Sequence, residues 1–385
     1  MPAKKKIIIV GPAHPLRGGG MSTFNERLAK ACSDAGHEVE IISFKLQYPS
    51  FLFPGKSQFT DEPAPPGIRI RSLINSVNPI NWIRTGNIIR RMNPDLVIIR
   101  YWIPFMGPAL GTIARRIRKN RHSVVIAITD NVVPHEKRPG DRALTRYFLK
   151  PVQGFITMSA SVMDDLEGFD KKKPRTLCLH PLYDNYGEPM ERKEALAQLG
   201  FPDDCSYLLF FGLVRKYKGL DLLIRALASP KLAHLPLRLI VAGEFYEDFD
   251  LYRKLIDDLG VCDKVIMENR FIPNAAVRSY FCAADLVVQP YRDATQSGVT
   301  QVAYHFDKPM VVTRVGALPE MVPDGKAGYV VEPDPERIAE AIRRFFDENR
   351  QHEFTANVKK EKLKYSWDVF LDAIDGLAEK ISNGG

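Results

Sequence analysis

The sequence predicts an α/β protein built from two doubly wound domains. Short apolar runs of strand length alternate with amphipathic runs of helical spacing along nearly the whole chain. A turn-rich segment interrupts this alternation once, at residues 179–189. The length of 385 residues also exceeds that of one ordinary hydrophobic core. We therefore expect a first domain over residues 1–185, a second over 186–365 and a closing helix over 366–385. Ligands should bind in a cleft that the carboxyl ends of both parallel sheets face.

The first domain opens with a strand, a glycine-rich loop and a helix, as a doubly wound sheet does. Gly19 and Gly20 end the loop, and such glycines let backbone N–H groups come close to a ligand. The loop is neither a dinucleotide fingerprint nor a P-loop, because a third glycine of GxGxxG and a following Gly-Lys-Ser/Thr are both missing. A plain flexible turn is an equal alternative. The expected strands are residues 6–10, 38–44, 95–100, 124–128 and 153–158, and the expected helices are 21–36, 77–92, 111–120 and one capped by Ser159.

The second domain repeats the alternation and contains a cationic loop. Gly212 ends its first strand, and Arg215 and Lys218 follow before a helix with apolar residues at helical spacing. Fixed cations beside a helix N-terminus make an anion site, and phosphate is the natural anion. A solvated basic turn is the alternative. The expected strands are residues 207–213, 237–242, 264–268, 286–289, 310–315 and 329–331, and the expected helices are 219–229, 248–259, 274–283, 297–306 and 335–348.

The net charge of +8 hides an asymmetry between the two halves. Of 54 Lys/Arg and 46 Asp/Glu, residues 1–185 hold 28 and 15, and the remainder hold 26 and 31. A basic half is typical of a protein that meets an anionic surface. The basic cluster at 115–121 and the side chains of Phe51, Leu52 and Phe53 in a proline-rich loop predict docking on an anionic membrane surface. For that loop, a lid packed on its own domain is the alternative. We expect no nucleic-acid partner, because no nucleic-acid module is present.

The compartment follows from the apolar runs and the cysteines. The N-terminal apolar run ends at Val10, which is too short for a signal-peptide core. No apolar run reaches the roughly 18 residues that a membrane span needs. The five cysteines are scattered and form no CxxC pair, which indicates a reducing environment. We expect a cytoplasmic protein, held peripherally on the inner face of the membrane where it docks.

Several motifs occur in order along the chain. The segment GHEV follows the first helix, and FGLVRKYKG, VAGEF, FIPNAAVRSYFCAADLVVQPY and SGVTQVAYHFDKPMVVTRVGALPEMVPDGKAGYVVEP follow in the second half, with YSWDVF near the end. Together they resemble the retaining glycosyltransferases of the GT-B fold, and within them glycosyltransferase family 4. The resemblance implies two doubly wound Rossmann-like domains facing a cleft. It also implies that the C-terminal helix crosses back and packs on the first domain.

In the enzymes that the chain resembles, the second domain holds a nucleotide-sugar donor. Lys218 matches a diphosphate-binding lysine by its Lys-Gly context. Arg215 replaces an arginine that would fall on Leu213, and both cations stabilise the leaving diphosphate. The donor-binding positions, from the resemblance and from the glycine and phosphate loops together, are Gly19, Gly20, Gly212, Glu244, Phe271, Ile272, Thr295, Gln296, Ser297, Gly298, Val299 and Glu320.

The sequence departs from the family at a pair of glutamates eight positions apart. Without gaps they would fall on Ala294 and Val302. Asp293 and Gln301 lie one residue earlier and are candidate replacements for these glutamates in ribose recognition. The loop at residues 294–299 still offers hydroxyls and amides at a helix start, which suits phosphate.

A second departure concerns the first domain. The histidine often found after the strand at 124–128 would fall near Asp130. We expect Asp130 and His135, with Glu136 nearby, to take its catalytic role against the sugar hydroxyl. A cap or turn role is an equal alternative for Asp130.

The predicted function is transfer of a hexosyl group from a UDP- or GDP-linked sugar to a glycan, lipid-linked or other hydroxyl acceptor, in polysaccharide biosynthesis. We expect no cofactor and no metal. Asp248 and Asp250 form the one Asp-x-Asp, and helix capping explains them more simply than a metal site. Two other classes are alternatives: a sugar-nucleotide epimerase of similar architecture and a non-catalytic sugar-nucleotide-binding protein. Acceptor-dependent release of nucleoside diphosphate separates the three.

Overall fold

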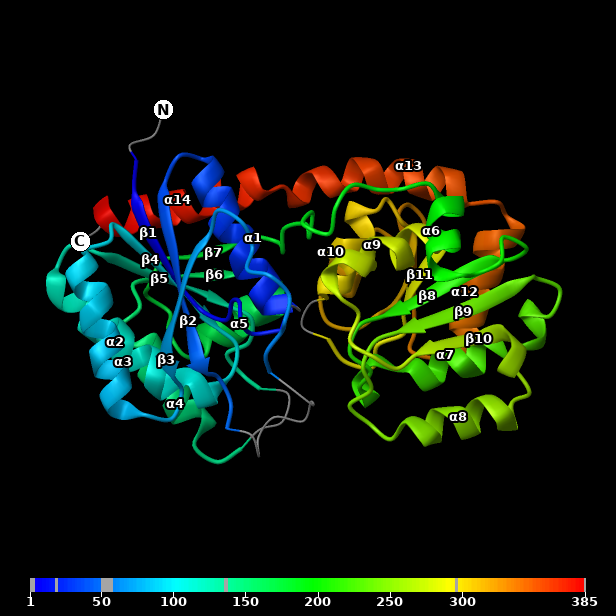
Figure 1. The fold of residues 1–385 in the computed structure, drawn as a ribbon, viewed down its shortest axis with the longest axis horizontal. Helices are drawn as coiled ribbons and strands as arrows, with labels where there is room; N and C mark the ends of the chain where they lie inside the picture. Colours follow the sequence, from blue (N-terminus) through cyan, green and yellow to red (C-terminus); the bar gives the residue numbers. More distant parts are fainter. Residues whose placement is uncertain (1–3, 18–19, 50–57, 135–137, 295–296, 384–385) are drawn as a thin grey trace. The chain divides into compact units, whose positions relative to one another are not determined.

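The computed structural model describes residues 4–17, 20–49, 58–134, 138–294 and 297–383. The chain divides into two compact units, the first made of Met1–Pro181 with Ser366–Gly385 and the second of Leu182–Tyr365. The division therefore falls at residue 181, against a predicted domain boundary at 185. Each unit is a parallel sheet with helices on both faces (Figure 1), so the predicted α/β class and doubly wound organisation are confirmed.

The first unit contains a sheet of strand order β3-β2-β1-β4-β5-β6-β7. Its strands are β1 (Lys6–Val10), β2 (Glu38–Leu46), β3 (Arg69–Asn75), β4 (Leu96–Tyr101), β5 (Val124–Thr129), β6 (Gly154–Thr157) and β7 (Arg175–Leu177). All neighbouring pairs run parallel. The order reverses between β1 and β4, so the crevice at the carboxyl end of this sheet lies there.

Two layers of helices cover this sheet. Its helices are α1 (Gly20–Asp34), α2 (Pro79–Met92), η2 (Pro104–Met106), α3 (Gly107–Ile117), η3 (Arg118–Asn120), α4 (Asp141–Leu149), α5 (Ala160–Glu167) and α14 (Trp367–Asn383). Helices α2, α3 and α4 pack on one another, and their apolar residues join one core with β1, β4 and β5. Helix α14 packs on α1, β5 and β6. The prediction that the last helix returns to the first domain is therefore confirmed.

The close approach of α14 to the sheet depends on a glycine. A Cβ at Gly154 would lie only 2.7 Å from Cδ1 of Ile381 and 3.1 Å from Cδ1 of Leu377. Lys5 also forms an ion pair with Asp375, with 2.8 Å between Nζ and Oδ1. The final helix is thus an integral part of the first unit.

Several elements of the first unit escaped the sequence analysis, among them β3. Its sequence RIRSLIN interleaves charge with apolar residues and is therefore not a continuous apolar run. Arg69 and Arg71 reach the buried carboxylate of Glu40 on β2, at 4.0 and 3.4 Å. This strand lies at the edge of the sheet, where charged side chains are tolerated.

The second unit contains a sheet of strand order β10-β9-β8-β11-β12-β13, again parallel throughout. Its strands are β8 (Ser206–Phe211), β9 (Leu237–Ala242), β10 (Val265–Glu268), β11 (Leu286–Gln289), β12 (Met310–Thr313) and β13 (Gly328–Val331). All six were predicted, within two residues at each end. The order reverses between β8 and β11, which marks the ligand-binding crevice of a doubly wound sheet.

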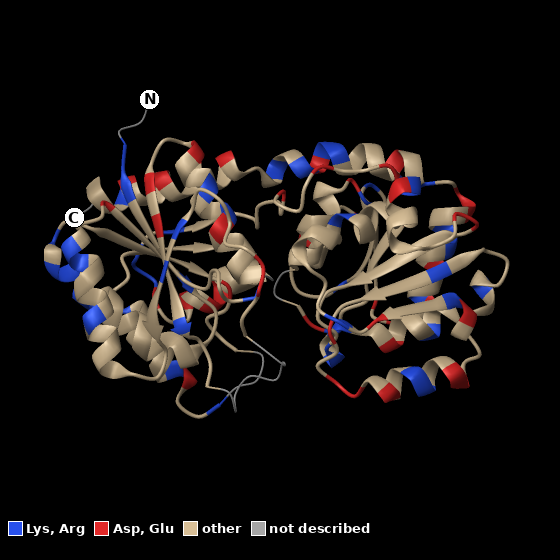
Figure 2. Ribbon diagram, viewed as in Figure 1, with Lys and Arg blue, Asp and Glu red and all other residues tan. Residues whose placement is uncertain are grey.

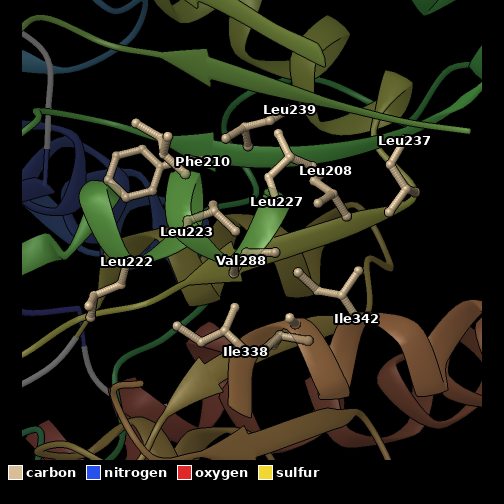
Figure 3. Packing of buried hydrophobic residues seen from close by; sticks show 14 of the residues in the cluster. Leu208, Phe210, Leu222, Leu223, Leu227, Leu237, Leu239, Val288, Ile338 and Ile342 are labelled. Carbon is tan, nitrogen blue, oxygen red and sulfur yellow. The ribbon is translucent and has the colours of Figure 1, made fainter. Parts of the chain in front are cut away.

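The predicted apolar face of α7 (Leu220–Leu227) forms the centre of the second core (Figure 3). Leu220, Leu223, Ile224 and Leu227 are fully buried against strands β8, β9 and β11 and helix α12 (Pro335–Asp347). Each such side chain contributes roughly 1.5–3 kcal/mol to stability. The helices of this unit are α6 (Arg192–Leu199), η4 (Lys216–Lys218), α7 (Leu220–Leu227), η5 (Pro230–Leu232), α8 (Phe249–Asp258), η6 (Cys262–Lys264), α9 (Asn274–Ala283), α10 (Gly298–His305), α11 (Leu318–Met321), α12 (Pro335–Asp347), α13 (Gln351–Glu361) and η7 (Lys362–Tyr365).

Among the described residues, none of the helices combines the length and the apolar character that crossing a bilayer would require.

Candidate functional site

The loops after β8 and β11 meet at the point where the strand order of the second sheet reverses. Gly219 adopts a left-handed conformation with φ of 66°. A Cβ there would lie 2.0 Å from the carbonyl oxygen of Pro290, so only glycine permits this contact. The backbone N–H of Arg292 donates to the carbonyl of Tyr217 at 2.6 Å. The two loops are therefore joined directly through their backbones.

A charged pair strengthens this junction. The Arg292 guanidinium donates to both oxygens of Asp221, at 2.7 and 2.6 Å. It also donates to the carbonyl of Lys216 at 3.2 Å. Arg292 follows β11, and Asp221 lies in the first turn of α7, so the pair fixes the cationic loop against the second loop.

Lys218, Gly212 and the first turn of α10 converge at one point. Gly212 has φ of 94°, and a Cβ built on it would lie 3.2 Å from Nζ of Lys218 and 3.7 Å from Cγ2 of Val299. The ammonium lies 5.6 Å from the centre of the Tyr291 ring, a cation–π contact. A side chain at position 212 would crowd this point. Lys218 of the cationic loop thus lies near the first turn of α10.

The electrostatics at this point favour an anion. Burial and the positive charge of Arg215 lower the pKa of Lys218 to about 8. A negative ligand would oppose both effects, because it stabilises the protonated amine. Arg215 itself is exposed, and its guanidinium lies 5.0 Å from the centre of the Tyr246 ring. Its carbonyl accepts the N–H of Lys218 at 2.8 Å, so the two cations share one short turn.

The predicted phosphate loop is described from Ser297 onward, and Thr295 and Gln296 lie outside the described residues. Ser297 is the residue before α10, but its hydroxyl does not cap the helix. It donates instead to Oε1 of Gln289 at 2.6 Å. Gly298 packs so closely that a Cβ would lie 2.9 Å from Cε2 of Tyr183. The helix start is therefore held firmly, with its amide groups not capped by the serine.

The other predicted donor residues lie in loops after neighbouring strands. Glu244 follows β9 and is buried, and its carbonyl accepts the N–H of Val214 at 2.9 Å. Ile272 is buried and Phe271 half-buried in the loop after β10. Glu320 is exposed in α11, after β12. Because carboxyl ends of parallel strands share one edge, these residues and Lys218 lie along the same edge of the second sheet.

The residues at and next to the positions of the two missing glutamates differ in burial. Asp293 is exposed, and Ala294 is buried. Gln301 is 0% exposed, and neither its Oε1 nor its Nε2 has a hydrogen-bond partner among the described residues. A buried amide without partners costs about 1–3 kcal/mol for each unmade bond. Gln301 therefore lies inside the second unit. Its buried position does not support the prediction that it replaces a glutamate in ribose recognition.

Of the two catalytic residues predicted in the first domain, the structure describes Asp130 but not His135. His135 and Gly19 lie outside the described residues, while Gly20 starts α1. Asp130 is buried just after β5, and Arg100 of β4 donates to both of its oxygens. A carboxylate held in this way is poorly placed to accept a proton from a sugar hydroxyl. The ion pair gives Asp130 a structural role, and its catalytic role stays a prediction.

A buried histidine adjoins this ion pair. Burial and the charge of Arg100 lower the pKa of His180 to about 3, so His180 is neutral at physiological pH. The Phe24 ring lies between the two groups, 3.9 Å from Cζ of Arg100 and 5.1 Å from the His180 ring. Phe24 belongs to α1, so this cluster joins the start of α1 to the carboxyl edge of the first sheet.

The Asp-x-Asp sequence is part of a helix cap. Oδ1 of Asp248 accepts the N–H of Asp250 at 3.0 Å at the start of α8, as the capping interpretation predicted. Within the described ranges, no cluster of three or more His, Cys, Asp or Glu side chains is arranged to hold a metal ion.

Three functional candidates were not found from the sequence: Gln289, Tyr291 and Arg292. Each lies at or just after the end of β11, and each contacts a residue of a predicted ligand loop. A polar residue as the last residue of a buried apolar strand was the available signal for Gln289.

Comparison with known proteins agrees with this architecture. Structures of similar fold include sucrose-phosphate synthase from Thermosynechococcus elongatus, at 17% identity and a TM-score of 0.76 over 99% of this chain and all of that one. Another is Anabaena HepE in complex with UDP-glucose, at 15% identity and a TM-score of 0.71 over 98% of this chain and 99% of that one. These likenesses show the GT-B fold.

The sequence comparisons identify the family. Residues 18–178 match Glycosyltransferase Family 4, and residues 205–348 match Glycosyl transferases group 1. A D-inositol 3-phosphate glycosyltransferase of Catenulispora acidiphila is 32% identical over 273 residues, 68% of this chain. This chain spans only 60% of the length of that relative. A second, from Thermobifida fusca, is 26% identical over 87% of this chain and 82% of its own length. The chain belongs to glycosyltransferase family 4, group 1, a family of enzymes of the transferase class.

Proposed function

We propose that the protein is a retaining glycosyltransferase that moves a sugar from a nucleotide-sugar donor to a hydroxyl acceptor. The observation that carries this proposal is the convergence of Lys218, Gly212 and the first turn of α10 where the second sheet reverses its strand order. This point combines a lysine cation with a helix N-terminus. Both features favour a diphosphate.

The residues of the site act on the leaving group in this proposal. Breaking the bond between the sugar and the diphosphate moves negative charge onto the phosphate oxygens. Lys218 stabilises that charge at short range, and Arg215 adds a second cation from the same turn. The junction between Arg292 and Asp221 keeps the loop in place, so little reorganisation accompanies the reaction.

The donor and the acceptor are proposed from chemistry and from the names of similar proteins. The HepE structures contain UDP or UDP-glucose, which supports a UDP-linked donor, with GDP as the other expected base. The relatives are named for D-inositol 3-phosphate, which supports a polyol phosphate acceptor beside the glycan and lipid-linked acceptors that we expect in polysaccharide biosynthesis.

The test is a panel of nucleotide sugars with and without acceptor. Thermal shift first finds the donor, because a ligand that binds the folded state raises its stability. Release of nucleoside diphosphate is then followed with and without candidate acceptors. Acceptor-dependent release supports a transferase. Isomerisation of the donor without release would indicate an epimerase, and binding without turnover would indicate a binding protein.

We also propose that protein charge takes the place of a metal and that the product retains the anomeric configuration of the donor. Cations and amides surround the proposed diphosphate position, whereas divalent ions prefer carboxylate oxygens. No carboxylate partner for a double displacement was found in the sequence, since Ala294 is inert. Same-face attack, with the departing phosphate accepting the acceptor proton, satisfies both conditions.

We further propose that the first unit docks on the inner, anionic surface of the membrane, with the protein otherwise in the cytoplasm. Residues 63–129 carry eleven Lys/Arg and a single acidic residue, Asp95. Helices α2 and α3 show no acidic residue in Figure 2. Charge complementarity with anionic lipid supports this surface. The predicted apolar loop at Phe51, Leu52 and Phe53 lies outside the described residues.

In this proposal, the cations that meet the lipid are those of the cluster that are not engaged between helices. Arg115 is occupied by Tyr147 of α4, with Cζ 3.7 Å from the ring centre, and Arg116 donates to Asn87 of α2 at 2.9 Å. These two arginines therefore hold helices together. The exposed cations of the cluster are Arg118, Lys119 and Arg121. Exposed apolar side chains also occur at the start of α2 and in the turn before it: Val77, Ile80 and Ile83, with Ile80 63% exposed.

A further inference from the structure

Gln289 connects the end of β11 to the first turn of α10. It is the last residue of the strand, and its side chain is 1% exposed. Oε1 accepts the hydroxyl of Ser297 at 2.6 Å and the hydroxyl of Thr300 at 3.1 Å. Nε2 faces Sδ of Met310 on β12 at 3.8 Å, which fixes the orientation of the amide. One buried carbonyl thus holds both ends of a helical turn.

The contact with Ser297 changes what the helix start can do. A serine before a helix usually accepts an N–H of the first turn with its own oxygen. Here the Ser297 side chain forms no such cap, because its hydroxyl is directed to Gln289. The side chain that would ordinarily satisfy the first-turn amides is therefore withdrawn from them. Those amides belong to the first turn of α10. Val299 of this turn lies near the Lys218 ammonium, beside Gly212.

The direction of the hydrogen bonds follows from counting protons. Ser297 has one hydroxyl proton, and the Gln289 carbonyl can only accept. In the 3.4 Å contact between Tyr291 Oη and Ser297 Oγ, the tyrosine is then the donor. Tyr291 is also the ring that faces the Lys218 ammonium. The chain from Tyr291 through Ser297 to Gln289 therefore links both sides of the proposed diphosphate position.

We propose that Gln289 is a positioning residue for the donor diphosphate. By accepting the protons of Ser297 and Thr300 it fixes the first turn of α10 beside Lys218 and keeps Ser297 from capping that turn. The inference rests on the proposed function, since it needs a nucleoside diphosphate at this point. Gln289 does not itself touch the ligand.

The test separates diphosphate binding from general stability. UDP and GDP are titrated by calorimetry against the full-length protein, and uridine and guanosine are titrated in parallel. Gln289→Leu removes the acceptor at similar size, and Thr300→Val removes one of its two donors. We expect Gln289→Leu to weaken nucleoside diphosphate binding roughly tenfold and Thr300→Val roughly threefold, with nucleoside affinity changed less than about twofold. The donor KM should rise in parallel.

A matched control and a double-mutant cycle test the mechanism. Ser279 of α9 also donates to a glutamine carbonyl, that of Gln198 of α6, at 2.8 Å. Ser279→Ala should lower thermal stability without separating diphosphate from nucleoside affinity. In the cycle, Thr300→Val should have little further effect once Gln289→Leu is present, because the two side chains act through one hydrogen bond.

The outcomes distinguish this inference from the function it rests on. If the wild type binds UDP or GDP but Gln289→Leu binds it equally well, the inference is overturned and the proposed function stands. Equal loss of nucleoside and nucleoside diphosphate affinity would show that Gln289 only stabilises the core and does not position the diphosphate site. If the wild type binds neither UDP nor GDP, the proposed function is contradicted, and so is the inference that rests on it. Should Gln289→Leu not fold, Thr300→Val alone decides by the same ratio.

Discussion

The guanidinium of Arg100 and the carboxylate of Asp130 form a two-point ion pair at the carboxyl edge of the first sheet, with 2.7 Å between Nε and Oδ2 and 2.6 Å between Nη2 and Oδ1. The third guanidinium nitrogen, Nη1, is buried and has no hydrogen-bond partner among the described residues. Arg100 therefore depends on Asp130 for its charge compensation.

Asp130→Ala should destabilise the protein strongly, because it leaves the Arg100 charge buried and uncompensated. Breaking a buried pair in this way costs about 3–5 kcal/mol. Urea unfolding measures the loss. The double replacement of Arg100 by Met and Asp130 by Leu should recover much of it. If Asp130→Ala instead keeps its stability and loses only turnover, Asp130 is catalytic, as first predicted from the sequence.

Lys218→Ala should weaken donor binding and turnover by roughly tenfold to a hundredfold, since a charge-assisted contact of about 1.5–3 kcal/mol is removed. Arg215→Ala should act in the same direction. Thermal stability should stay unchanged or rise with Lys218→Ala, because a partly buried cation disappears. Lys216 lies on the same turn and is exposed, so Lys216→Ala is the matched control. Wild-type kinetics in the Lys218 and Arg215 variants would contradict the anion site.

Nucleoside diphosphate affinity should depend on pH through Lys218. Its pKa in the folded protein is about 8, below the ordinary 10.5, and a bound anion raises it. Affinity should therefore be full below pH 8 and fall above it, by at most about tenfold per pH unit. Calorimetry of UDP and GDP from pH 6.5 to about 9.5 measures this, and the wild-type profile should flatten in Lys218→Ala.

The same shift has the opposite sign for stability. Between pH 8 and 10.5 the unfolded state holds the Lys218 proton that the folded state has lost. The contribution of Lys218 to the free energy of unfolding should then rise with pH over this window. The difference between wild type and Lys218→Ala in urea unfolding isolates it. A difference that falls with pH would show that the pKa is not lowered.

Features that depend on residues close together in the sequence were predictable, and features that depend on residues far apart were not. The strands β8 to β13 are mainly apolar runs, and Lys218 lies in a short cationic loop directly after one of them, so both were predictable. Edge strand β3 was not, because its charged residues pair with Glu40 on another strand. The partner of Asp130 lies 30 residues away, and that of Gln289 lies across a loop. Only the fold brings these groups together.

Membrane association should need the exposed apolar side chains of α2 as well as the cations. Ile80→Asp with Ile83→Asp should reduce co-sedimentation with vesicles of phosphatidylcholine and phosphatidylglycerol. Replacing Arg118, Lys119 and Arg121 with Gln should remove its dependence on anionic lipid and on salt. Leu363 is 71% exposed in the second unit, so Leu363→Asp is the control. If the wild type does not bind strongly anionic vesicles at low salt, the docking proposal is wrong.

Turnover should survive EDTA, and NMR of the product should show the anomeric configuration of the donor. Survival in EDTA follows from the cations and amides at the proposed diphosphate position, and retention follows from the lack of a carboxylate partner for a double displacement in the sequence. The charge-for-metal proposal fails if chelation abolishes turnover and Mg²⁺ or Mn²⁺ restores it. An inverted anomeric centre would place the enzyme in another mechanistic class.

The return of α14 to the first unit has a consequence for biosynthesis. The ribosome makes strands β1 to β7 early, yet the helix that covers β5 and β6 is encoded after the whole second unit. Domains made first usually fold first. Here the first unit must wait with the apolar surface around Gly154 uncovered while about 180 further residues are synthesised, a count that follows from the span Leu182–Tyr365. The unit whose strands are synthesised first therefore finishes folding last. Until α14 is made, its exposed apolar surface is available for a chaperone to bind.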